Sequence, residues 1–245
     1  ETRKSLTVFH EHGRSGTMDY QHNQVVAQAY LEHGYRVIMI DTTNSQNNDS
    51  GGTLEKFTMQ GHHEDLMDVI EQIREKESRG RYKKGFAIAA HSMGGYSALR
   101  AAQQDLPGLN HVFAYAPVTD GQKQIQARYD NLPDVVTAWQ KAGYLDEPSD
   151  DGRTQARLTW QQFQDWAKHS IFPEIDQIRV PVGLVAAGND RWVPTFHVRE
   201  AAEALPNCVS LHTIPGTTHT FKEDIPALKE HAIKVIPVLE RGFTL

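Results

Sequence analysis

The sequence has few of the features that mark several large classes of protein. It contains one cysteine, Cys208, so no disulfide can form within the chain and the fold does not depend on an oxidising compartment. No apolar run approaches the ~18 residues that a membrane-spanning helix needs. The net charge of -6 at pH 7 gives no support to nucleic-acid binding, which needs a basic surface. We therefore expect neither a membrane span nor a nucleic-acid partner.

What remains is the composition of an ordinary soluble globular protein, with 39% hydrophobic and 23% charged residues. A chain of 245 residues can form one α/β domain, and we expect residues 1–245 to do so. No signal peptide is visible, which favours a cytoplasmic location. The chain opens at Glu1 and not at a methionine, so the sequence also allows a leader that has been removed. The oligomeric state, monomer or homodimer, is also left open.

Short apolar runs alternate with longer helical patterns along the chain. The runs are almost continuously apolar, as expected for strands of a parallel sheet that is covered on both faces. Alternation of this kind predicts βαβ units and a doubly wound sheet. The predicted strands are Leu6–His10, Arg36–Ile40, Phe86–Ala90, His111–Ala116, Val182–Ala187 and Ser210–Ile214.

Helices are indicated between these strands by apolar residues at helical spacing. Leu66, Val69, Ile70 and Ile73 recur at i, i+3, i+4 and i+7. The other predicted helices are Tyr96–Gln104, Phe196–Ala204 and Ile225–Leu239.

Residues 118–179 interrupt the alternation, because this stretch of about sixty residues carries no strand signal. It is far longer than a usual connection of ~2–6 residues and contains three of the four tryptophans. Partial helical spacing of Leu158, Phe163 and Trp166 favours a small helical cap inserted after the fourth strand.

The segment "FAIAAHSMGGYSALR", Phe86 to Arg100, is a candidate for a serine nucleophile on a strand-to-helix turn. Such a turn brings backbone close to backbone, so the positions two before and two after the serine must be small. Here they are Ala90 and Gly94, and alanine in place of the usual glycine weakens the pattern without breaking it. The alternative is a buried strand whose following helix has Ser92 as its N-cap.

A serine nucleophile needs a base and an acid that orients the base. His219 lies in the polar loop "PGTTHTF" after the last predicted strand, and Asp190 lies in "AAGNDRWVP" after the preceding one. Loops at the carboxyl ends of strands are where ligands bind in open α/β sheets. The competing acid is Asp120, which follows the fourth strand.

The segment "FHEHGRSG" after the first strand is a candidate oxyanion loop. Gly13 allows a turn that points the amide of Arg14 inward, to join the amide of Met93, the residue after the serine. A metal pair at His10 and His12, or at His62 and His63, is the less favoured alternative, because no further ligands with recognisable spacing accompany them. We expect no metal.

With these motifs in place, the chain resembles the α/β-hydrolase superfamily of serine hydrolases over nearly its whole length. The resemblance rests on the His12-Gly13 segment, the elbow "AHSMGG", the "GNDRWVP" segment and the final "GTTHTF". Within the superfamily the chain is similar to small capped carboxylesterases, including feruloyl and cinnamoyl esterases and serine aminopeptidase-like hydrolases. The resemblance implies the α/β-hydrolase fold, with about six mainly parallel strands, and without the β-hairpin that usually precedes the first of these strands.

The prediction is a carboxylesterase that cleaves short-chain or aromatic acyl esters through Ser92, His219 and Asp190, with no cofactor. Thioesterases, peptidases and C–C hydrolases use the same triad, and a non-catalytic binding protein could use the same scaffold. We expect the pocket to take a modest apolar or aromatic group of a small-molecule ester, not a long lipid chain or a charged phosphate. The predicted substrate-binding residues are Gly13, His91, Trp139, Trp160, Trp166 and Trp192.

Overall fold

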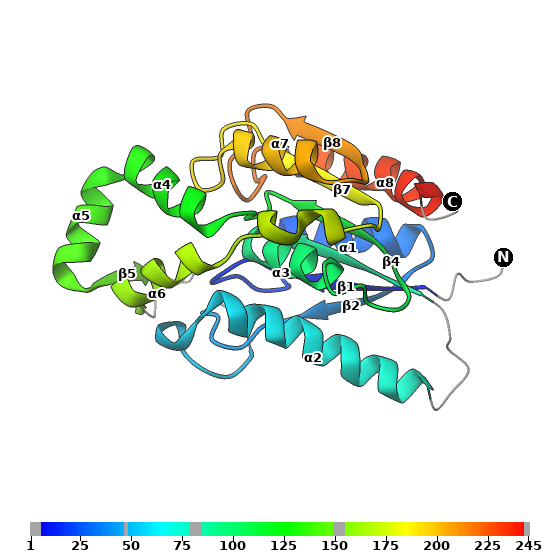
Figure 1. The fold of residues 1–245 in the computed structure, drawn as a ribbon, viewed down its shortest axis with the longest axis horizontal. Helices are drawn as coiled ribbons and strands as arrows, with labels where there is room; N and C mark the ends of the chain where they lie inside the picture. Colours follow the sequence, from blue (N-terminus) through cyan, green and yellow to red (C-terminus); the bar gives the residue numbers. More distant parts are fainter. Residues whose placement is uncertain (1–5, 47–48, 79–84, 149–154, 243–245) are drawn as a thin grey trace.

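The computed structural model describes residues 6–46, 49–78, 85–148 and 155–242. Its centre is a six-stranded parallel sheet of order β2-β1-β3-β4-β7-β8 (Figure 1). All six strands coincide, to within two residues at either end, with the strands predicted from the sequence. They are β1 (Thr7–Glu11), β2 (Arg36–Ile40), β3 (Phe86–His91), β4 (Leu109–Tyr115), β7 (Val182–Ala187) and β8 (Cys208–Ile214).

Helices cover both faces of this sheet. One face carries α1 (Gln21–Glu32) and α8 (Ile225–Gly242), and the other carries α2 (Met59–Ser78), α3 (Ser92–Ala102) and α7 (Thr195–Ala204). Four of these five helices match predicted ones. The exception is α1, whose apolar residues Val26, Ala29 and Tyr30 are buried against the sheet and which the sequence analysis did not identify.

Two separate cores follow from the alternation of side chains along each strand. In β1, Val8 packs on the α1–α8 side while Phe9 packs on the α2–α3 side. In β3, Ala87 packs on the α1–α8 side and Ile88 packs on the α2–α3 side. Because both kinds of position must be apolar, the strands read as continuous apolar runs in the sequence.

The segment between β4 and β7, which we call the cap, projects at one end of the molecule, opposite the end where α8 finishes (Figure 1). Two hydrogen bonds from Nε2 of Gln162, each 2.7 Å long, join it to the carbonyls of Leu54 and Phe57, in and after the short helix η1 (Leu54–Lys56). The cap contains α4 (Gly121–Asn131), α5 (Pro133–Ala142), β5 (Tyr144–Pro148), β6 (Gln155–Thr159), α6 (Trp160–Asp165), η2 (Trp166–Lys168) and η3 (Phe172–Gln177).

The cap is not wholly helical, because β5 and β6 pair as an antiparallel hairpin. The prediction that this stretch contains no strand was therefore wrong. The sequences of β5 and β6, YLDEP and QARLT, are polar and lack the apolar run by which the sheet strands were recognised. The hairpin is stabilised instead across its strands, where Arg157 bonds Asp146 at 2.9 Å and lies over the ring of Tyr144.

An aromatic cluster forms the core of the cap. Phe163 lies at its centre, with ring centroids 4.6 Å from Trp139 and 5.1 Å from both Trp160 and Trp166. Nε1 of Trp139 donates to the carbonyl of Leu158 at 2.9 Å, which satisfies the one polar group of that buried ring. Contacts of this kind contribute about 0.5–1.5 kcal/mol per ring pair beyond burial, so the cluster adds to the stability of the cap.

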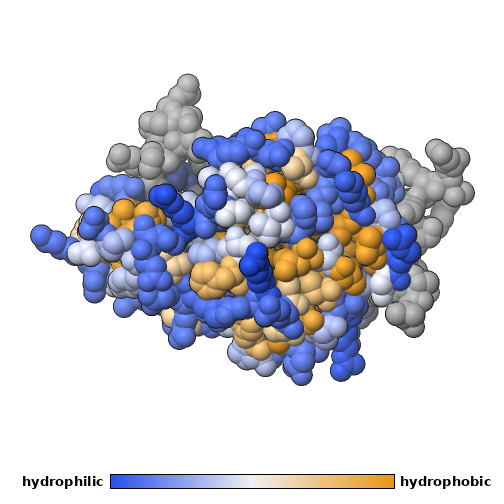
Figure 2. Space-filling model, turned by 90° about the horizontal axis from the view of Figure 1, so that it is seen from above, coloured by the Kyte–Doolittle hydropathy of each residue, from blue (hydrophilic) through white to orange (hydrophobic). Residues whose placement is uncertain are grey.

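The surface seen in Figure 2 is a mosaic in which orange hydrophobic groups lie between blue hydrophilic ones. The largest exposed apolar side chains include Leu31, Phe196 and Leu211, which belong to three different elements. Within the described residues, no helix is both long and apolar enough to cross a membrane.

Candidate active site

Ser92 is the first residue of α3, directly after β3, and its φ of +54° lies in the left-handed region that residues other than glycine avoid. The neighbouring backbone explains why small residues surround it. A Cβ at Gly94 would lie 2.5 Å from the carbonyl oxygen of His12, and one at Gly13 would lie 2.8 Å from Cβ of Ser92. Ala90, fully buried in β3 between β1 and β4, shows that the position two before the serine has room for a methyl group.

His219 and Asp190 lie in the loops that follow β8 and β7, as the sequence analysis predicts. The two loops are tied together by the amides of Gly188 and Asn189, which donate to the carbonyls of Ile214 and Thr217. Nε2 of His219 is 2.8 Å from Oγ of Ser92, and Nδ1 of His219 is 2.6 Å from Oδ2 of Asp190. The structure therefore brings the three residues into one hydrogen-bonded chain.

Asp190 is held in place by its second carboxylate oxygen. Oδ1 accepts hydrogen bonds from the amides of Trp192 at 2.8 Å and Val193 at 2.9 Å, and the side chain is buried. Asp120, the alternative acid, is engaged elsewhere: it caps α4 by accepting from the amide of Lys123 and also accepts from the hydroxyl of Ser170. The geometry thus joins Asp190, not Asp120, to the histidine.

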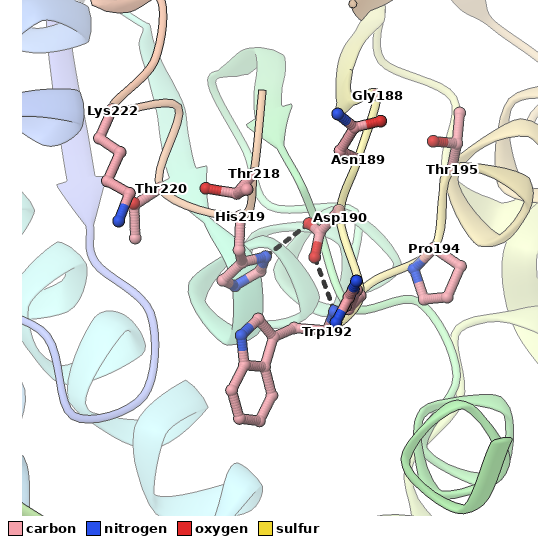
Figure 3. A pocket seen from close by; sticks show the side chains of 11 residues that line it. Gly188, Asn189, Asp190, Trp192, Pro194, Thr195, Thr218, His219, Thr220 and Lys222 are labelled. Atoms are coloured by element: carbon pink, nitrogen blue, oxygen red, sulfur yellow. Dashed lines mark hydrogen bonds and ion pairs between the residues drawn. The ribbon is translucent and has the colours of Figure 1, made fainter. Parts of the chain in front are cut away.

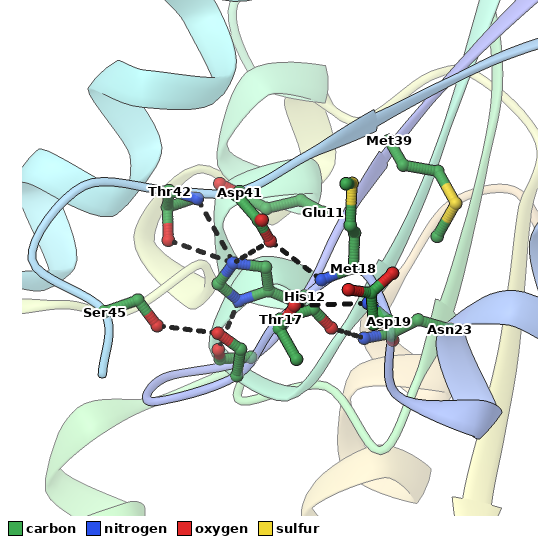
Figure 4. Close-up of polar contacts among 12 residues, drawn as sticks. Glu11, His12, Thr17, Met18, Asp19, Asn23, Met39, Asp41, Thr42 and Ser45 are labelled. Carbon is green, nitrogen blue, oxygen red and sulfur yellow. Dashed lines mark hydrogen bonds and ion pairs between the residues drawn. The ribbon is translucent and has the colours of Figure 1, made fainter. Parts of the chain in front are cut away.

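The loop after β1, residues 12–18, is anchored by buried polar contacts (Figure 4). Nδ1–H of His12 donates to the carbonyl of Gly13 at 2.7 Å, and Nε2 accepts from the amide of Thr42 at 3.1 Å. Burial lowers the pKa of His12, which keeps the ring in the neutral form that can both donate and accept. Asp41 accepts from the amide of Met18 at 2.8 Å, so the loop is fixed at both ends.

A small pocket of about 110 Å³ opens on Ser92. Arg14 and Met93, whose amides are the predicted oxyanion donors, line it beside Ser92 and His219. Met93 lies in the first turn of α3, where backbone N–H groups have no partner within the helix. The opposite wall comes from the cap and the loop after β7, through Val118, Gln124, Arg128 and Trp192.

A second cavity, of about 880 Å³, lies on the other side of His219 (Figure 3). Its lining comes from the loops after β7 and β8, including Asn189, Thr218 and Lys222. His219 and Trp192 line both cavities, so these two rings separate the space around Ser92 from the wider one. Trp192 is 38% exposed, in keeping with a side chain that packs against neither core.

The other predicted substrate-binding residues occupy different places. Trp139 and Trp160 belong to the aromatic core of the cap, and Trp166 lies buried beneath two arginines. Gly13 packs against Ser92. Among the described residues that line the two cavities, Trp192 is the only tryptophan.

His91 lies behind the three-residue chain instead of facing the cavities. Its Nε2–H donates to the backbone carbonyl of His219 at 2.9 Å, and its ring stacks on Tyr115. Burial lowers the pKa of His91 well below its usual value, and the neighbouring His22 adds to the shift, so the ring is neutral. The contact holds the backbone of His219 in register with Ser92, a role that the sequence did not reveal.

The histidines considered as metal ligands each bond to protein groups. His10 bonds the hydroxyl of Tyr115, His62 bonds the carbonyl of His12, and His63 bonds the carbonyl of Ser97. In the part of the chain that the structure describes, no three His, Cys, Asp or Glu side chains are grouped so that they could hold a metal ion.

Sequence reasoning missed the polar residues that the cap contributes to the small pocket. Gln124 and Arg128 are both buried, although they are of types that are mostly exposed. They stand four residues apart in α4 and so lie on one face of that helix. That spacing was the signal in the sequence that could have identified them. Two polar residues at i and i+4 far more often lie on a solvent-exposed face of a helix, however, so the signal is weak.

With the geometry described, comparison with protein families gives one match that spans most of the chain. The model of the alpha/beta hydrolase family matches residues 8–231. The chain belongs to the alpha/beta hydrolase family. A search of curated protein sequences finds no match for this hydrolase.

Solved structures agree with this assignment at the level of the fold. Est1E from Butyrivibrio proteoclasticus with bound ferulic acid superposes with a TM-score of 0.77 at 19% identity, over 98% of this chain and 91% of Est1E. Alpha/beta hydrolase domain-containing protein 10 from mouse gives 0.73 at 17% identity, over 98% and 92%. GrgF from a Penicillium species gives 0.74 at 17% identity, over 100% and 92%. At these identities the likeness establishes the fold of the hydrolase and not its substrate.

Proposed function

We propose that this hydrolase is a serine carboxylesterase that cleaves short-chain or aromatic acyl esters through an acyl-enzyme. The observation that carries the proposal is the hydrogen-bonded chain from Oγ of Ser92 through His219 to Asp190. A serine hydroxyl becomes a competent nucleophile when a base within hydrogen-bond reach takes its proton. The left-handed backbone of Ser92 supports the proposal, because strain of this kind is a feature of functional sites.

In the first half-reaction, Oγ of Ser92 attacks the ester carbonyl carbon and its proton passes to Nε2 of His219. The amides of Arg14 and Met93 receive the negative charge that develops on the carbonyl oxygen. The intermediate then collapses, the bond to the leaving oxygen breaks, and His219 returns the proton to that oxygen. Asp190 holds the imidazole in the tautomer that makes both transfers possible.

Water completes the second half-reaction by the same steps. It attacks the acyl carbon and gives one proton to His219, and that proton then returns to Ser92 as the acid is released. The reaction uses only the ester and water, so it requires no cofactor.

The sizes of the two cavities favour short acyl groups. The pocket that contains Ser92 and Met93 measures about 110 Å³, which is small beside the ~300–1,000 Å³ of most ligand pockets. The acyl group stays bonded to Ser92 in the acyl-enzyme, so this pocket is the one that it occupies. The leaving alcohol takes its proton from Nε2 of His219, on the side that faces Ser92. Est1E, which binds ferulic acid, supports including aromatic esters in the range to be tested.

The experiment that tests the proposal is labelling with a fluorophosphonate, followed by intact mass measurement. We expect one adduct on the native chain and none on Ser92→Ala. An adduct that persists in Ser92→Ala would place the nucleophile elsewhere.

Turnover of p-nitrophenyl acetate tests whether the residues act together. Ser92→Ala and His219→Ala should each lower kcat/KM by at least about 10⁴-fold, and the double variant should be hardly worse than either, because the members of a triad act as a unit. Losses that multiply would contradict the proposal.

A further inference from the structure

A chain of buried polar side chains lies behind the site, on the side of the sheet that carries α1 and α8. Tyr115, the last residue of β4, is wholly buried, and its hydroxyl donates to Oδ1 of Asn23 at 2.6 Å. Nδ2 of Asn23 donates in turn to the carbonyl of Thr17 at 2.8 Å (Figure 4). The hydroxyl of Tyr115 is therefore joined to the loop after β1, to which Thr17 belongs.

Only one arrangement of protons satisfies this chain. The carbonyl of Thr17 can only accept, so the amide of Asn23 turns its nitrogen to that carbonyl and its oxygen to Tyr115. The phenol gives its single proton to Asn23, so the 2.8 Å contact with His10 is a hydrogen bond donated by Nε2–H of the histidine. Burial lowers the pKa of His10 to about 3 and raises the pKa of Tyr115, so both rings stay neutral and keep these protons.

The ring of Tyr115 contacts the other half of the site. It stacks on His91, with ring centroids 5.1 Å apart, and its centroid lies 6.1 Å from that of Phe221. His91 donates to the carbonyl of His219, and Phe221 follows that histidine by two residues. One side chain therefore serves both parts of the site, through its hydroxyl to the loop after β1 and through its ring to the residues beside the base.

The loop after β1 passes this restraint to the nucleophile. Gly16, next to Thr17, donates its amide to the carbonyl of Gly13 at 3.1 Å. Gly13 lies so close to Ser92 that a Cβ there would be 2.8 Å from Cβ and 3.3 Å from Oγ of the serine. A shift of the loop therefore changes the space in which the serine hydroxyl turns.

We propose that Tyr115 is a positioning residue whose hydroxyl holds the loop after β1 against Ser92, so that the serine hydroxyl stays aligned with His219. The inference rests on the proposed esterase function, since it concerns the same nucleophile. The effect of Tyr115 on the reaction passes through Asn23 and the loop. Because a misplacement of about 1 Å costs about 10²-fold in rate, the loss of one anchor from a loop that keeps others should cost about tenfold.

Tyr115→Phe tests the proposal, because it removes the hydroxyl and keeps the ring that packs on His91. We expect kcat for p-nitrophenyl acetate to fall by about tenfold while KM stays almost unchanged. The pH dependence of kcat/KM should keep its midpoint, since the bond from His219 to Asp190 is untouched. A kcat equal to that of the native enzyme would overturn the proposal, and so would a shifted midpoint, which would place the effect on the base.

Tyr30→Phe is the matched control. Tyr30 is also wholly buried on the α1–α8 side, and its hydroxyl bonds Nε2 of His111 at 3.1 Å, so this pair likewise joins α1 to β4. It lies about 10 Å further along α1 from the loop than Asn23 does. Its loss should lower the melting temperature as Tyr115→Phe does and leave kcat unchanged. Equal losses of kcat in the two variants would contradict the proposal.

Asn23→Leu breaks the same link at its other end. We expect the same loss of about tenfold in kcat, and no further loss when Asn23→Leu is combined with Tyr115→Phe, because the two residues act in one chain. Losses that multiply in the double variant would overturn the proposal. Should Tyr115→Phe fail to fold, a native kcat in Asn23→Leu would by itself do so.

The rate of fluorophosphonate labelling separates this inference from the esterase proposal, because labelling needs an aligned Ser92 but no turnover of an ester. Labelling slowed by about tenfold in Tyr115→Phe and not in Tyr30→Phe supports the positioning role even if the native enzyme hydrolyses no ester. Labelling of Tyr115→Phe at the native rate would leave Ser92 as the nucleophile and remove the role of Tyr115.

Discussion

Single residues at the site combine a strained backbone with firmly held partners. The φ of +54° at Ser92 costs about 1–3 kcal/mol for a residue other than glycine. The surrounding contacts hold that conformation: Gly94 sits against the carbonyl of His12, and the carbonyl of Ser92 accepts from the amide of Val118. Behind them His91 fixes the backbone of His219. Ser92 and His219 are thus positioned by contacts outside the hydrogen-bonded chain that they form with Asp190.

The first prediction concerns Asp190, because both of its oxygens are engaged. Asp190→Asn keeps the shape of the side chain but replaces the carboxylate that bonds Nδ1 of His219 with an amide. The base therefore stays present but in the wrong tautomer. We expect kcat for p-nitrophenyl acetate to fall by about 10²–10⁴-fold, less than in Ser92→Ala.

Asp120→Asn is the control for this substitution. Asparagine is also a good N-cap, so the start of α4 should be kept and activity should stay well above that of Asp190→Asn. If Asp120→Asn were inactive while Asp190→Asn kept its activity, the assignment of the acid would be wrong.

At the scale of elements, the turn from β3 to α3 decides where the serine hydroxyl points. The loop after β1 crosses this turn so closely that the main-chain oxygens of Glu11 and His12 would both lie within 3 Å of a side chain at Gly94. The position two before the serine has more room, and Ala90 fills it without exposure. The family pattern of glycine at both positions is therefore needed here at only one of them.

The second prediction compares these two positions. Gly94→Ala should lower both the melting temperature and kcat, because its Cβ would meet the carbonyl oxygen of His12 at 2.5 Å and push the loop that carries Arg14. Ala90→Gly removes one methyl group and should keep most activity, with a loss of stability of about 1 kcal/mol. Thermal unfolding and ester turnover measured on both variants check the expectation. Equal effects of the two changes would show that the loop does not constrain the turn.

At the scale of the whole molecule, several histidines besides the proposed base, His219, are buried. His10, His22 and His62 lie inside the protein, and burial lowers the pKa of each to about 3. In the unfolded chain the same side chains have a pKa near ~6.5. The unfolded state therefore binds more protons between these values, and the stability contributed at neutral pH is lost as the pH falls.

The third prediction follows from this difference. The free energy of unfolding should be constant above pH ~7 as far as these groups are concerned. Below about pH 6 each buried histidine should remove up to about 1.4 kcal/mol per pH unit. Glu11 opposes the trend, because burial raises the pKa of its carboxyl and so favours the protonated folded state.

Urea unfolding at a series of pH values measures this dependence. The midpoint should drop steeply between pH 6 and pH 4, and His22→Gln should make the drop shallower. A midpoint that stays constant over this range would contradict the prediction.

Most of the fold could be predicted from the sequence because its signals are local. Strands such as β3 and β7 are buried at every position and are almost wholly apolar, so Phe86–His91 and Val182–Ala187 stand out within six residues. Small residues around Ser92 and the placing of Asp190 and His219 after successive strands are likewise visible within short segments. The hairpin of β5 and β6 was missed because its strands are mostly polar, and each places a single leucine, Leu145 or Leu158, against the core.

What only the tertiary structure decided is which distant residues meet at the pocket. The sequence by itself determined the strands, the turn that carries Ser92 and the order serine, aspartate, histidine. It did not determine that Arg128 stacks on Trp192, that Arg14 reaches Trp166 or that His91 supports His219 from behind. The two arginine contacts depend on the path of the cap past the loops after β1 and β7. That path is set by the packing of Trp139, Phe163 and their neighbours, which no local pattern of residues encodes.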